Sequence, residues 1–434
     1  MNPLYRNDKP GAFPDSWYAA TATIPPQRPA LRGDVTADVG IVGAGYTGLC
    51  AALTLARRGF KVVVLDAHRA GWGASGRNGG QVGSGYNKSQ RWLAGRLGAD
   101  KARALWDLAE DAKRQVREFS AAHAPDARYL PGVAHGETRA SGVAEGHDDA
   151  AWLARNYGYD QIAALDKNAM QDLVKTQYYI GGTLDMGAGH IHPLRYVLGL
   201  ARAAEAAGVV IHERSEVHQI VPGARVTLRT GQGRLNADHV ILAGNGYLPN
   251  LDRQVAAKVM PINSFIAATD PLGDRANDVL AQDIAVADDR FVVNYFRLSE
   301  DKRLLFGGRE NYSIGFPSDV QSALIRRITT LFPQLAGVRI EHAWGGTLGV
   351  TMTRLPAVLR IAPNILSASG FSGHGVALSG FAGTVMGQAI AGQAERFDIM
   401  AQLPVPAFPG GGAFRAPLLA LAMTWFSLRD RLGL

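Results

Sequence analysis

The stretch DVGIVGAGYTGLCAALTLARRGFKVVVLD, residues 38–66, decides the fold. Residues 39–42 predict a buried strand, and residues 49–57 predict a helix that ends at Gly59. Residues 61–65 predict a second strand, so the order is strand, helix, strand. This order predicts parallel strands with a helix packed on one face of the sheet.

The turn between the first strand and the helix, GAGYTG at residues 43–48, is typical of a dinucleotide site. Gly43 permits a tight turn, Gly45 lets a pyrophosphate approach the backbone, and Gly48 lets the helix press against the strand. Free N–H groups at the helix start attract phosphates, and Asp66 follows at the spacing of a ribose-binding acid. The alternative, a plain glycine turn with Asp66 as a surface acid, explains neither the spacing nor the small residue Ala44.

The amino-acid composition narrows the class of protein to which the chain can belong. With 434 residues, of which 47% are hydrophobic and 19% charged, the chain predicts a globular protein of two domains. The net charge of +7 favours anionic ligands, but scattered Lys and Arg residues argue against a nucleic-acid partner. The lone Cys50 excludes an internal disulfide and is expected to be a small core residue.

The two ends of the chain carry weaker signals. Residues 1–18 contain acids and prolines and no apolar stretch of the signal-peptide kind, and no apolar run has membrane-spanning length, so we expect a cytoplasmic protein. Residues 401–434 predict a C-terminal tail helix with an apolar face that includes Leu418 and Trp425. We favour docking of this face on the protein itself or on a partner subunit over contact with a membrane. The oligomeric state stays open.

The expected fold is a two-domain α/β protein, with a Rossmann-like nucleotide domain and an inserted substrate domain built on an antiparallel sheet. Residues 261–308 favour the sheet because they read as short alternating strands, whereas residues 91–180 read largely as helix. The expected divisions are a leader at 1–35, a discontinuous nucleotide domain at 36–90, 188–255 and 345–400, the substrate domain at 91–187 and 256–344, and the tail at 401–434.

Two further glycine clusters favour a flavin over a nicotinamide. GASGRNGGQ at residues 73–81 combines small residues with the hydrogen-bonding side chains Ser75, Arg77, Asn78 and Gln81. GFSGHGVAL at residues 370–378 opens a helix whose N–H groups suit the pyrimidine edge of a flavin and its anionic reduced form. Frequent glycines, 51 in all, are the alternative explanation of either cluster alone. Together the clusters predict FAD.

The chain resembles the D-amino-acid-oxidase-like (DAO) family of FAD-dependent oxidoreductases, and within it most resembles the gamma-glutamylputrescine oxidases. The segments that carry this resemblance are 16–20 (SWYAA), 43–48, 73–81, 295–298 (YFRL), 303–308 (RLLFGG), 343–346 (AWGG), 353–356 (TRLP), 373–375 (GHG), 408–411 (FPGG) and 428–433 (LRDRLG). The resemblance implies a fold like that of glycine oxidase and sarcosine oxidase, with FAD extended through the nucleotide domain.

The resemblance and the motifs together give the expected cofactor-binding residues. Asp66 is expected to hold the adenosine ribose, and the backbone of Val217 to meet adenine. The full set is Gly43, Gly45, Tyr46, Thr47, Gly48, Asp66, Ala67, Ala74, Ser75, Arg77, Asn78, Gly79, Gly80, Gln81, Val217, Gly244, Asn245, Gly246, Phe371, Gly373, His374, Gly375, Val376, Ala377 and Leu378. No metal ligands are expected.

Departures from the family pattern narrow the class of substrate that we expect. Several amino-acid-oxidising relatives carry an arginine four residues after the tryptophan of the WxG segment, where it binds the substrate carboxylate; here that residue is Leu348. An amine without an adjacent carboxylate is therefore favoured. Sarcosine-oxidase relatives use a lysine for oxygen activation where this chain has Leu305. Non-covalent FAD is expected, because Cys50 is poorly placed for attachment and residues 73–81 contain no histidine.

The implied chemistry is hydride transfer from the amine-bearing carbon to flavin N5, which gives an imine and then an aldehyde, with oxygen reduced to hydrogen peroxide. Desolvation of the substrate ammonium assists because the reacting amine must be neutral. Trp344 and Tyr295 are candidate cavity walls, with core aromatics as the alternative, and Arg297 is a candidate for a distal carboxylate, with an inter-strand role as the alternative. His374 is expected to contribute backbone more than a catalytic imidazole.

Two other functions remain open at this point. One is a flavin-dependent dehydrogenase that oxidises an amino acid or an N-methyl amine and passes the electrons to a quinone. The other is a flavin-binding protein without turnover, in a structural or sensory role.

Overall fold

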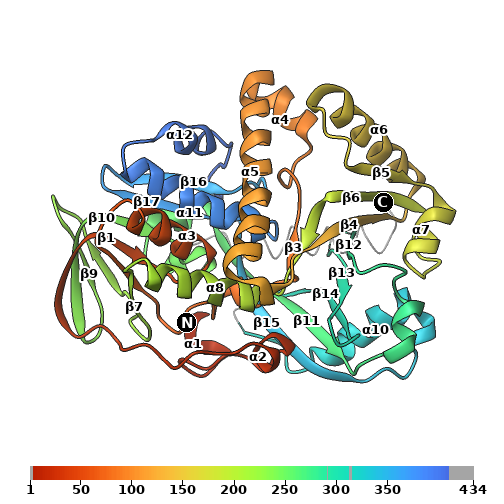
Figure 1. Cartoon of the computed structure of the whole chain (residues 1–434), viewed down its shortest axis with the longest axis horizontal. Coiled ribbons are helices and arrows are strands. Elements are labelled where there is room, and N and C mark those ends of the chain that lie inside the picture. Colours follow the sequence, from red (N-terminus) through yellow and green to blue (C-terminus); the bar gives the residue numbers. More distant parts are fainter. Residues whose placement is uncertain (1–2, 291, 312–314, 410–434) are drawn as a thin grey trace.

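The computed structural model of the chain describes residues 3–290, 292–311 and 315–409. Figure 1 shows two lobes side by side, each built around one β-sheet, with the long helix α5 (Ala99–His123) between them. Residues 410–434, which hold most of the expected tail helix, lie outside the described residues.

The first lobe contains an eight-stranded sheet in the order β16-β17-β10-β1-β2-β7, with β9 paired to β10 and β8 to β9. Strands β17, β10, β1, β2 and β7 run parallel, as the strand–helix–strand pattern predicts. All four residues of β2 are buried, which is typical of a parallel strand covered on both faces. The bounds are β1 Gly33–Val42, β2 Val62–Leu65, β7 Val210–His212, β8 Gln219–Val221, β9 Val226–Arg229, β10 Gly233–Leu242, β16 Ala357–Ala362 and β17 Ile365–Ser369.

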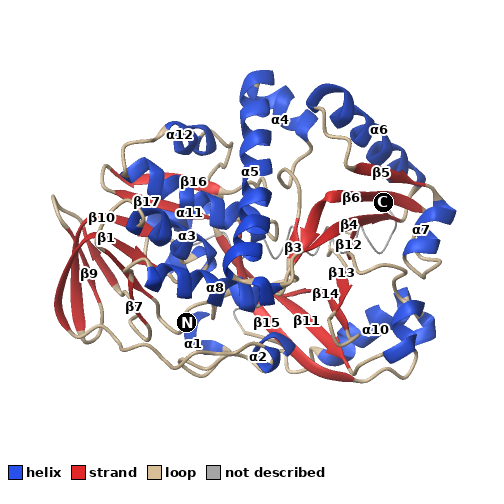
Figure 2. Ribbon diagram, in the orientation of Figure 1, coloured by secondary structure: helices blue, strands red, loops and turns tan. Residues whose placement is uncertain are grey.

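Helices of distant sequence cover this sheet (Figure 2). They are α3 (Tyr46–Ala56), α8 (Pro193–Ala206), α11 (Val376–Ile390) and α12 (Glu395–Ala401). Helices α3 and α11 lie in close contact because glycines face the neighbouring helix. A Cβ on Gly383 would stand 2.0 Å from the carbonyl oxygen of Thr47. Both helices begin at glycine-rich turns, so this contact fixes the two turns relative to each other.

The second lobe contains a nine-stranded sheet in the order β15-β11-β14-β13-β12-β4-β6-β3, with β5 paired to β6. Its pairs are antiparallel apart from β4 with β12. Buried phenylalanines, including Phe265, Phe296 and Phe332, form a separate core under helix α10. The bounds are β3 Gln81–Val82, β4 Leu130–Glu137, β5 Ile162–Leu165, β6 Gly181–His190, β11 Met260–Thr269, β12 Ala285–Asp288, β13 Tyr295–Leu298, β14 Leu304–Asn311, β15 Ile340–Val350, α4 Gln90–Leu97, α6 Ala140–Tyr157, α7 Lys167–Leu173 and α10 Gln321–Leu331. Helix α9 (Arg253–Lys258) packs on β16 of the first lobe.

Two elements lie across the expected divisions, and one strand lies in a segment that was expected to be largely helix. Strand β15 runs across the expected boundary at 344/345 and belongs wholly to the second sheet. Helix α5, assigned to the substrate domain, packs on α11, α8 and α12 of the first lobe. Residues 91–180, expected to be largely helix, also contain β4, whose small residues Gly132, Ala134 and Gly136 gave no strand signal.

The leader is more ordered than the sequence predicts. Residues 1–35 include the short helices α1 (Pro3–Arg6) and α2 (Trp17–Thr21), and Tyr18 is completely buried between the rings of Trp344 and His192. In Figure 1 this segment runs along the lower edge of the first lobe and reaches the junction of the two lobes at α2. Within the described ranges, no helix has the length and apolar character that crossing a membrane requires.

Candidate functional site

A cavity of about 520 Å³ lies where the glycine-rich turns of the first lobe meet. Its walls come from the turn after β1, the turn after β10, the 73–81 loop and the segment before α11. The expected cofactor residues that line it are Gly43, Gly45, Tyr46, Thr47, Asp66, Ala67, Ala74, Ser75, Asn78, Val217, Gly244, Asn245, Phe371, Gly373, Gly375 and Val376. These residues share one cavity although they are spread over most of the chain.

The turn after β1 requires its glycines. Gly43 has φ +106°, and a Cβ there would lie 2.9 Å from the carbonyl oxygen of Ala243. A Cβ on Gly48 would lie 1.9 Å from the carbonyl oxygen of Gly43, so this glycine serves helix packing and does not line the cavity. A Cβ on Gly45 would meet Ser75 Oγ at 2.7 Å. The bare backbone at the start of α3 therefore faces the cavity, as binding of a phosphate requires.

Asp66 ties the end of β2 to this turn. Its Oδ2 accepts a hydrogen bond from the backbone N–H of Ala44 at 2.8 Å, and its Oδ1 accepts from that of His68 at 2.8 Å. Burial raises the pKa of Asp66 to about 6, although both backbone hydrogen bonds oppose this shift. A hydrogen-bonded acid in the cavity wall, next to the glycine turn, fits the ribose end of a dinucleotide.

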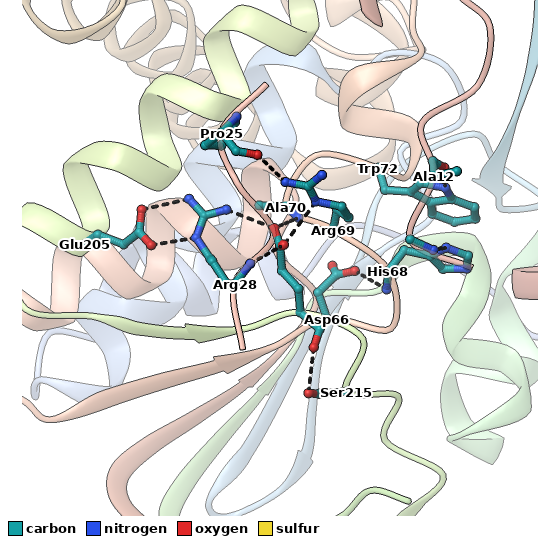
Figure 3. Close-up of polar contacts among 12 residues, drawn as sticks. Ala12, Pro25, Arg28, Asp66, His68, Arg69, Ala70, Trp72, Glu205 and Ser215 are labelled. Atoms are coloured by element: carbon teal, nitrogen blue, oxygen red, sulfur yellow. Dashed lines mark hydrogen bonds and ion pairs between the residues drawn. The ribbon is translucent and has the colours of Figure 1, made fainter. Parts of the chain in front are cut away.

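A buried ion-pair network lies directly behind Asp66 (Figure 3). The Glu213 carboxylate, 1% exposed, accepts from Arg28 Nη1 at 2.9 Å, from Arg69 Nε at 3.1 Å and from the backbone N–H of Ala70 at 3.0 Å. Arg28 also forms a two-pronged contact with Glu205 at 2.5 and 2.7 Å. The network joins the leader to the loop that follows Asp66. No local pattern in the sequence indicated it.

The segment before α11 contributes backbone more than side chains. Phe371, Gly373, Gly375 and Val376 line the cavity, so the N–H groups at the start of α11 lie at the same cavity as those of α3. His374 does not line it: its Nε2 lies 3.1 Å from the carbonyl oxygen of Gly85, and burial lowers its pKa. The expected residues Ala377 and Leu378 are buried in the core and do not line the cavity.

Several expected residues of the 73–81 loop lie away from the cavity wall. Arg77, expected to donate to the cofactor, instead donates to the carbonyl oxygens of Trp72 at 2.7 Å and Gly345 at 3.0 Å and pairs with Asp8 at 2.9 Å. A buried guanidinium needs several acceptors, and these backbone carbonyls supply them. The other expected residues absent from the cavity wall are Gly79, Gly80, Gln81, whose amide donates to the Val286 carbonyl oxygen, and Gly246, which packs on the β15 backbone.

Trp344, Tyr295 and Arg297, the candidates for the substrate cavity, also lie outside the cavity wall. Trp344 is 3% exposed, and its indole N–H donates to the carbonyl oxygen of Arg77 at 3.0 Å. Arg297, the candidate for a distal carboxylate, donates through its guanidinium to the carbonyl oxygens of Gly79 at 3.0 Å and Ile191 at 3.1 Å. The Tyr295 ring packs over Gly79 and Gly307. The structure therefore favours the packing alternatives for Trp344 and Arg297.

Several residues that line the cavity were not predicted from the sequence. Trp72 adjoins the 73–81 loop and was within reach of a motif argument, whereas Leu4 comes from the leader and carried no signal. The other cavity residues outside the expected set include Glu216, His218, Tyr247, Leu248, Leu251, Leu348, Ser372 and Ser379. Cys50 is buried in the core and is not part of the wall, so the cavity offers no thiol from this residue for covalent attachment.

A second buried polar cluster joins the two lobes beside His374. Lys113 on α5 is 4% exposed, and its Nζ donates to Ser84 Oγ at 2.6 Å, to Tyr159 Oη at 2.8 Å and to Glu110 Oε1 at 2.9 Å. Ser84 and Tyr159 in turn donate to the two oxygens of Asp185 at 2.5 and 2.6 Å. The cluster holds the segment around Ser84, whose neighbour Gly85 accepts the hydrogen bond from His374.

Replacing Lys113 with methionine is expected to lower the free energy of unfolding by about 3 kcal/mol, because Glu110 and Asp185 lose the buried cation that compensates them. Urea denaturation followed by tryptophan fluorescence measures the loss. The exposed Lys101 on the same helix is a matched control, and Lys101→Met should change the value by less than about 0.5 kcal/mol. Equal effects of the two substitutions would contradict the role assigned to Lys113.

Fold and cavity together define a class: a two-domain α/β protein in which the starts of two helices, α3 and α11, line one cavity, an arrangement that suits a dinucleotide. The family model described as FAD dependent oxidoreductase (DAO) matches residues 38–389, and the chain belongs to this family. The family assignment confirms the expected FAD cofactor, and the glycine turns, Asp66 and the two helix starts are residues that fit it.

Relatives of known sequence and structure agree with this assignment. The chain is 42% identical to the probable oxidoreductase OrdL of Rhizobium meliloti (strain 1021) over 96% of this chain and 97% of that protein. It is 38% identical to the gamma-glutamylputrescine oxidoreductase of Escherichia coli (strain K12) over 96% and 98%. The glycine oxidase of Geobacillus kaustophilus, 20% identical, superimposes with a TM-score of 0.70 over 83% of this chain and 95% of that one, which confirms the expected fold.

Proposed function

We propose that this FAD-dependent oxidoreductase oxidises an amine of the gamma-glutamylputrescine type at a carbon–nitrogen bond, with oxygen as the electron acceptor. The observation that carries the proposal is the 38% identity to the gamma-glutamylputrescine oxidoreductase of Escherichia coli over 96% of this chain. Oxidation of the amine to an imine transfers two electrons to the flavin, hydrolysis of the imine by water yields an aldehyde and ammonia, and reduction of oxygen by the reduced flavin yields hydrogen peroxide.

The cavity wall supports a substrate without a carboxylate next to the amine. Leu348 lines the cavity and packs beside Met260, Ile262 and Phe408. A leucine offers no partner to a carboxylate, and an apolar surrounding favours the neutral form of an amine. FAD, when bound, supplies the two-electron acceptor. The residues of this chain bind and orient the cofactor: the starts of α3 and α11 present N–H groups, and Asp66 holds the turn between β1 and α3.

A substrate panel tests the proposal. Purified holoprotein is mixed without oxygen with gamma-glutamylputrescine, putrescine, glycine and D-alanine, and loss of flavin absorbance is followed. The same mixtures in air are assayed for peroxide. We expect the fastest bleaching with gamma-glutamylputrescine and one peroxide per turnover. Faster bleaching with glycine or D-alanine would contradict the amine class, and bleaching without peroxide would contradict oxygen as the acceptor and support a dehydrogenase.

Replacing Leu348 with arginine is expected to shift substrate preference toward carboxylates. A charge-assisted hydrogen bond contributes about 1.5–3 kcal/mol, so the ratio of kcat/KM for D-alanine to that for gamma-glutamylputrescine should rise by about tenfold or more. Leu348→Met keeps the position apolar and serves as the control. An unchanged ratio in an arginine variant that retains its flavin spectrum would contradict the assignment of Leu348 to the substrate side.

A further inference from the structure

We propose that residues 4–12, hereafter the clasp, close the adenosine end of the FAD site and set the rate at which FAD leaves. The proposal rests on the FAD site and is independent of which amine is oxidised. Its starting point is Leu4, which lines the same cavity as Asp66 and Val217 although it belongs to the leader. A cofactor lying along this wall is covered on one side by a segment far from the nucleotide motifs in sequence.

His68 fastens the clasp at both ends. Its Nδ1 accepts a hydrogen bond from the backbone N–H of Gly11 at 3.0 Å, so its Nε2 carries the hydrogen and donates to the carbonyl oxygen of Leu4 at 2.7 Å. The side chain is completely buried, and burial lowers its pKa to about 4, which keeps the imidazole neutral. The backbone N–H of the same residue donates to Asp66. One residue therefore connects the clasp to the predicted ribose-binding acid.

Trp72 continues this connection into the cavity wall (Figure 3). Its ring stacks on His68 with centroids 3.6 Å apart and an interplanar angle of 6°. Its indole N–H donates to the carbonyl oxygen of Ala12 at 2.9 Å, and the residue itself lines the cavity. A displacement of the clasp therefore removes partners from two buried rings, one of which faces the cofactor site.

Two side chains of the clasp add polar contacts to the same wall. Tyr5 Oη donates to Glu216 Oε2 at 2.7 Å, and Glu216 is a cavity residue beside Val217. Asp8 pairs with Arg77 Nη1 at 2.9 Å, and the Arg77 side chain is only 2% exposed. These contacts all reach residues in or next to the cavity wall. That distribution is what a cofactor-retaining segment requires, whereas a purely structural leader has no need to meet the cavity.

FAD release is the direct test. Wild type, a chain that starts at Phe13 and the point variant Leu4→Ala are loaded with FAD and diluted into excess apo-glucose oxidase, which traps the released FAD, and the glucose oxidase activity that this FAD restores is followed over time. We expect the dissociation rate to rise by about tenfold in the shortened chain, equivalent to about 1.4 kcal/mol of lost contacts, and by a smaller factor in Leu4→Ala. Asp15→Asn is the control, since this 88%-exposed carboxylate lies in the same leader beyond the clasp and pairs with His342.

Limited trypsin digestion of the unaltered protein provides a second readout that does not depend on how a variant folds. The exposed Arg6 lies within the clasp, so cleavage after it reports opening. We expect FAD to slow this cleavage of apoprotein by about fivefold or more, since a ligand that binds only the closed form lowers the open population. Equal cleavage rates with and without FAD, or dissociation rates within twofold of wild type in both clasp variants, would overturn the proposal. Because neither readout contains an amine, failure of the proposed substrate leaves both intact.

Discussion

Replacing Glu213 with glutamine is expected to lower the free energy of unfolding by about 3 kcal/mol and to weaken FAD binding. Loss of the carboxylate charge leaves two guanidinium groups, those of Arg28 and Arg69, in a buried environment with fewer partners. The expected loss lies at the lower end for a broken buried ion pair, because Glu205 still pairs with Arg28 and the Pro25 carbonyl oxygen still accepts from Arg69. Urea denaturation and FAD titration of the apoprotein measure the two effects.

Glu205→Gln is the matched control for this experiment. Glu205 contacts the same arginine but its side chain is 39% exposed, so water can replace it, and the expected loss is below about 1 kcal/mol. If Glu213→Gln were as stable as Glu205→Gln, the network in Figure 3 would not stabilise the junction between the leader and the loop after Asp66.

Replacing Gly383 with alanine is expected to reduce FAD occupancy severely and to cost about 3 kcal/mol of stability. The added Cβ would stand 2.0 Å from the Thr47 carbonyl oxygen and 3.1 Å from the Ala51 backbone nitrogen, and backbone atoms cannot rotate out of the way. Helices α3 and α11 must separate, and both of their N-termini line the cofactor cavity. Thermal unfolding and the flavin-to-protein absorbance ratio after purification measure the outcome.

A glycine-to-alanine substitution at a position with open space around it provides the control. Gly95 lies inside α4, and a Cβ built there meets no heavy atom of the described residues within 4 Å. Because alanine favours helix over glycine, Gly95→Ala should stabilise the protein by up to about 1 kcal/mol. A stable Gly383→Ala variant with full FAD would show that the two helices need not touch for the site to form.

The parts of the site that lie close together in sequence could be predicted. The turn from Gly43 to Gly48, the acid at the end of β2 and the glycine turn before α11 each have a local reason, because backbone conformation and close approach select glycine within a few residues. The start of α8 also has a local cause, since the His192 side chain caps this helix by accepting from the backbone N–H of Arg195.

The directions of two arginine side chains could not be predicted in this way. Arg77 and Arg297 stand in motifs that suggest ligand binding, yet both guanidinium groups are buried and donate to backbone carbonyl oxygens. Apart from the nearby Trp72 carbonyl oxygen, these acceptors, on Gly345, Gly79 and Ile191, are far away in sequence, and only folding brings them within hydrogen-bonding distance. A buried cation takes whichever acceptors its surroundings offer.

By itself, therefore, the sequence determined the nucleotide fold, the FAD cofactor and the order of strands around Asp66, because backbone sterics and hydrophobic periodicity act over short stretches of chain. Only the tertiary structure decided what encloses that cofactor site. The contacts of His68 with Leu4 and Gly11, and those of Glu213 with Arg28, join segments that share no local pattern. Their cause is the need of buried polar groups for partners, and those partners are chosen by the whole fold.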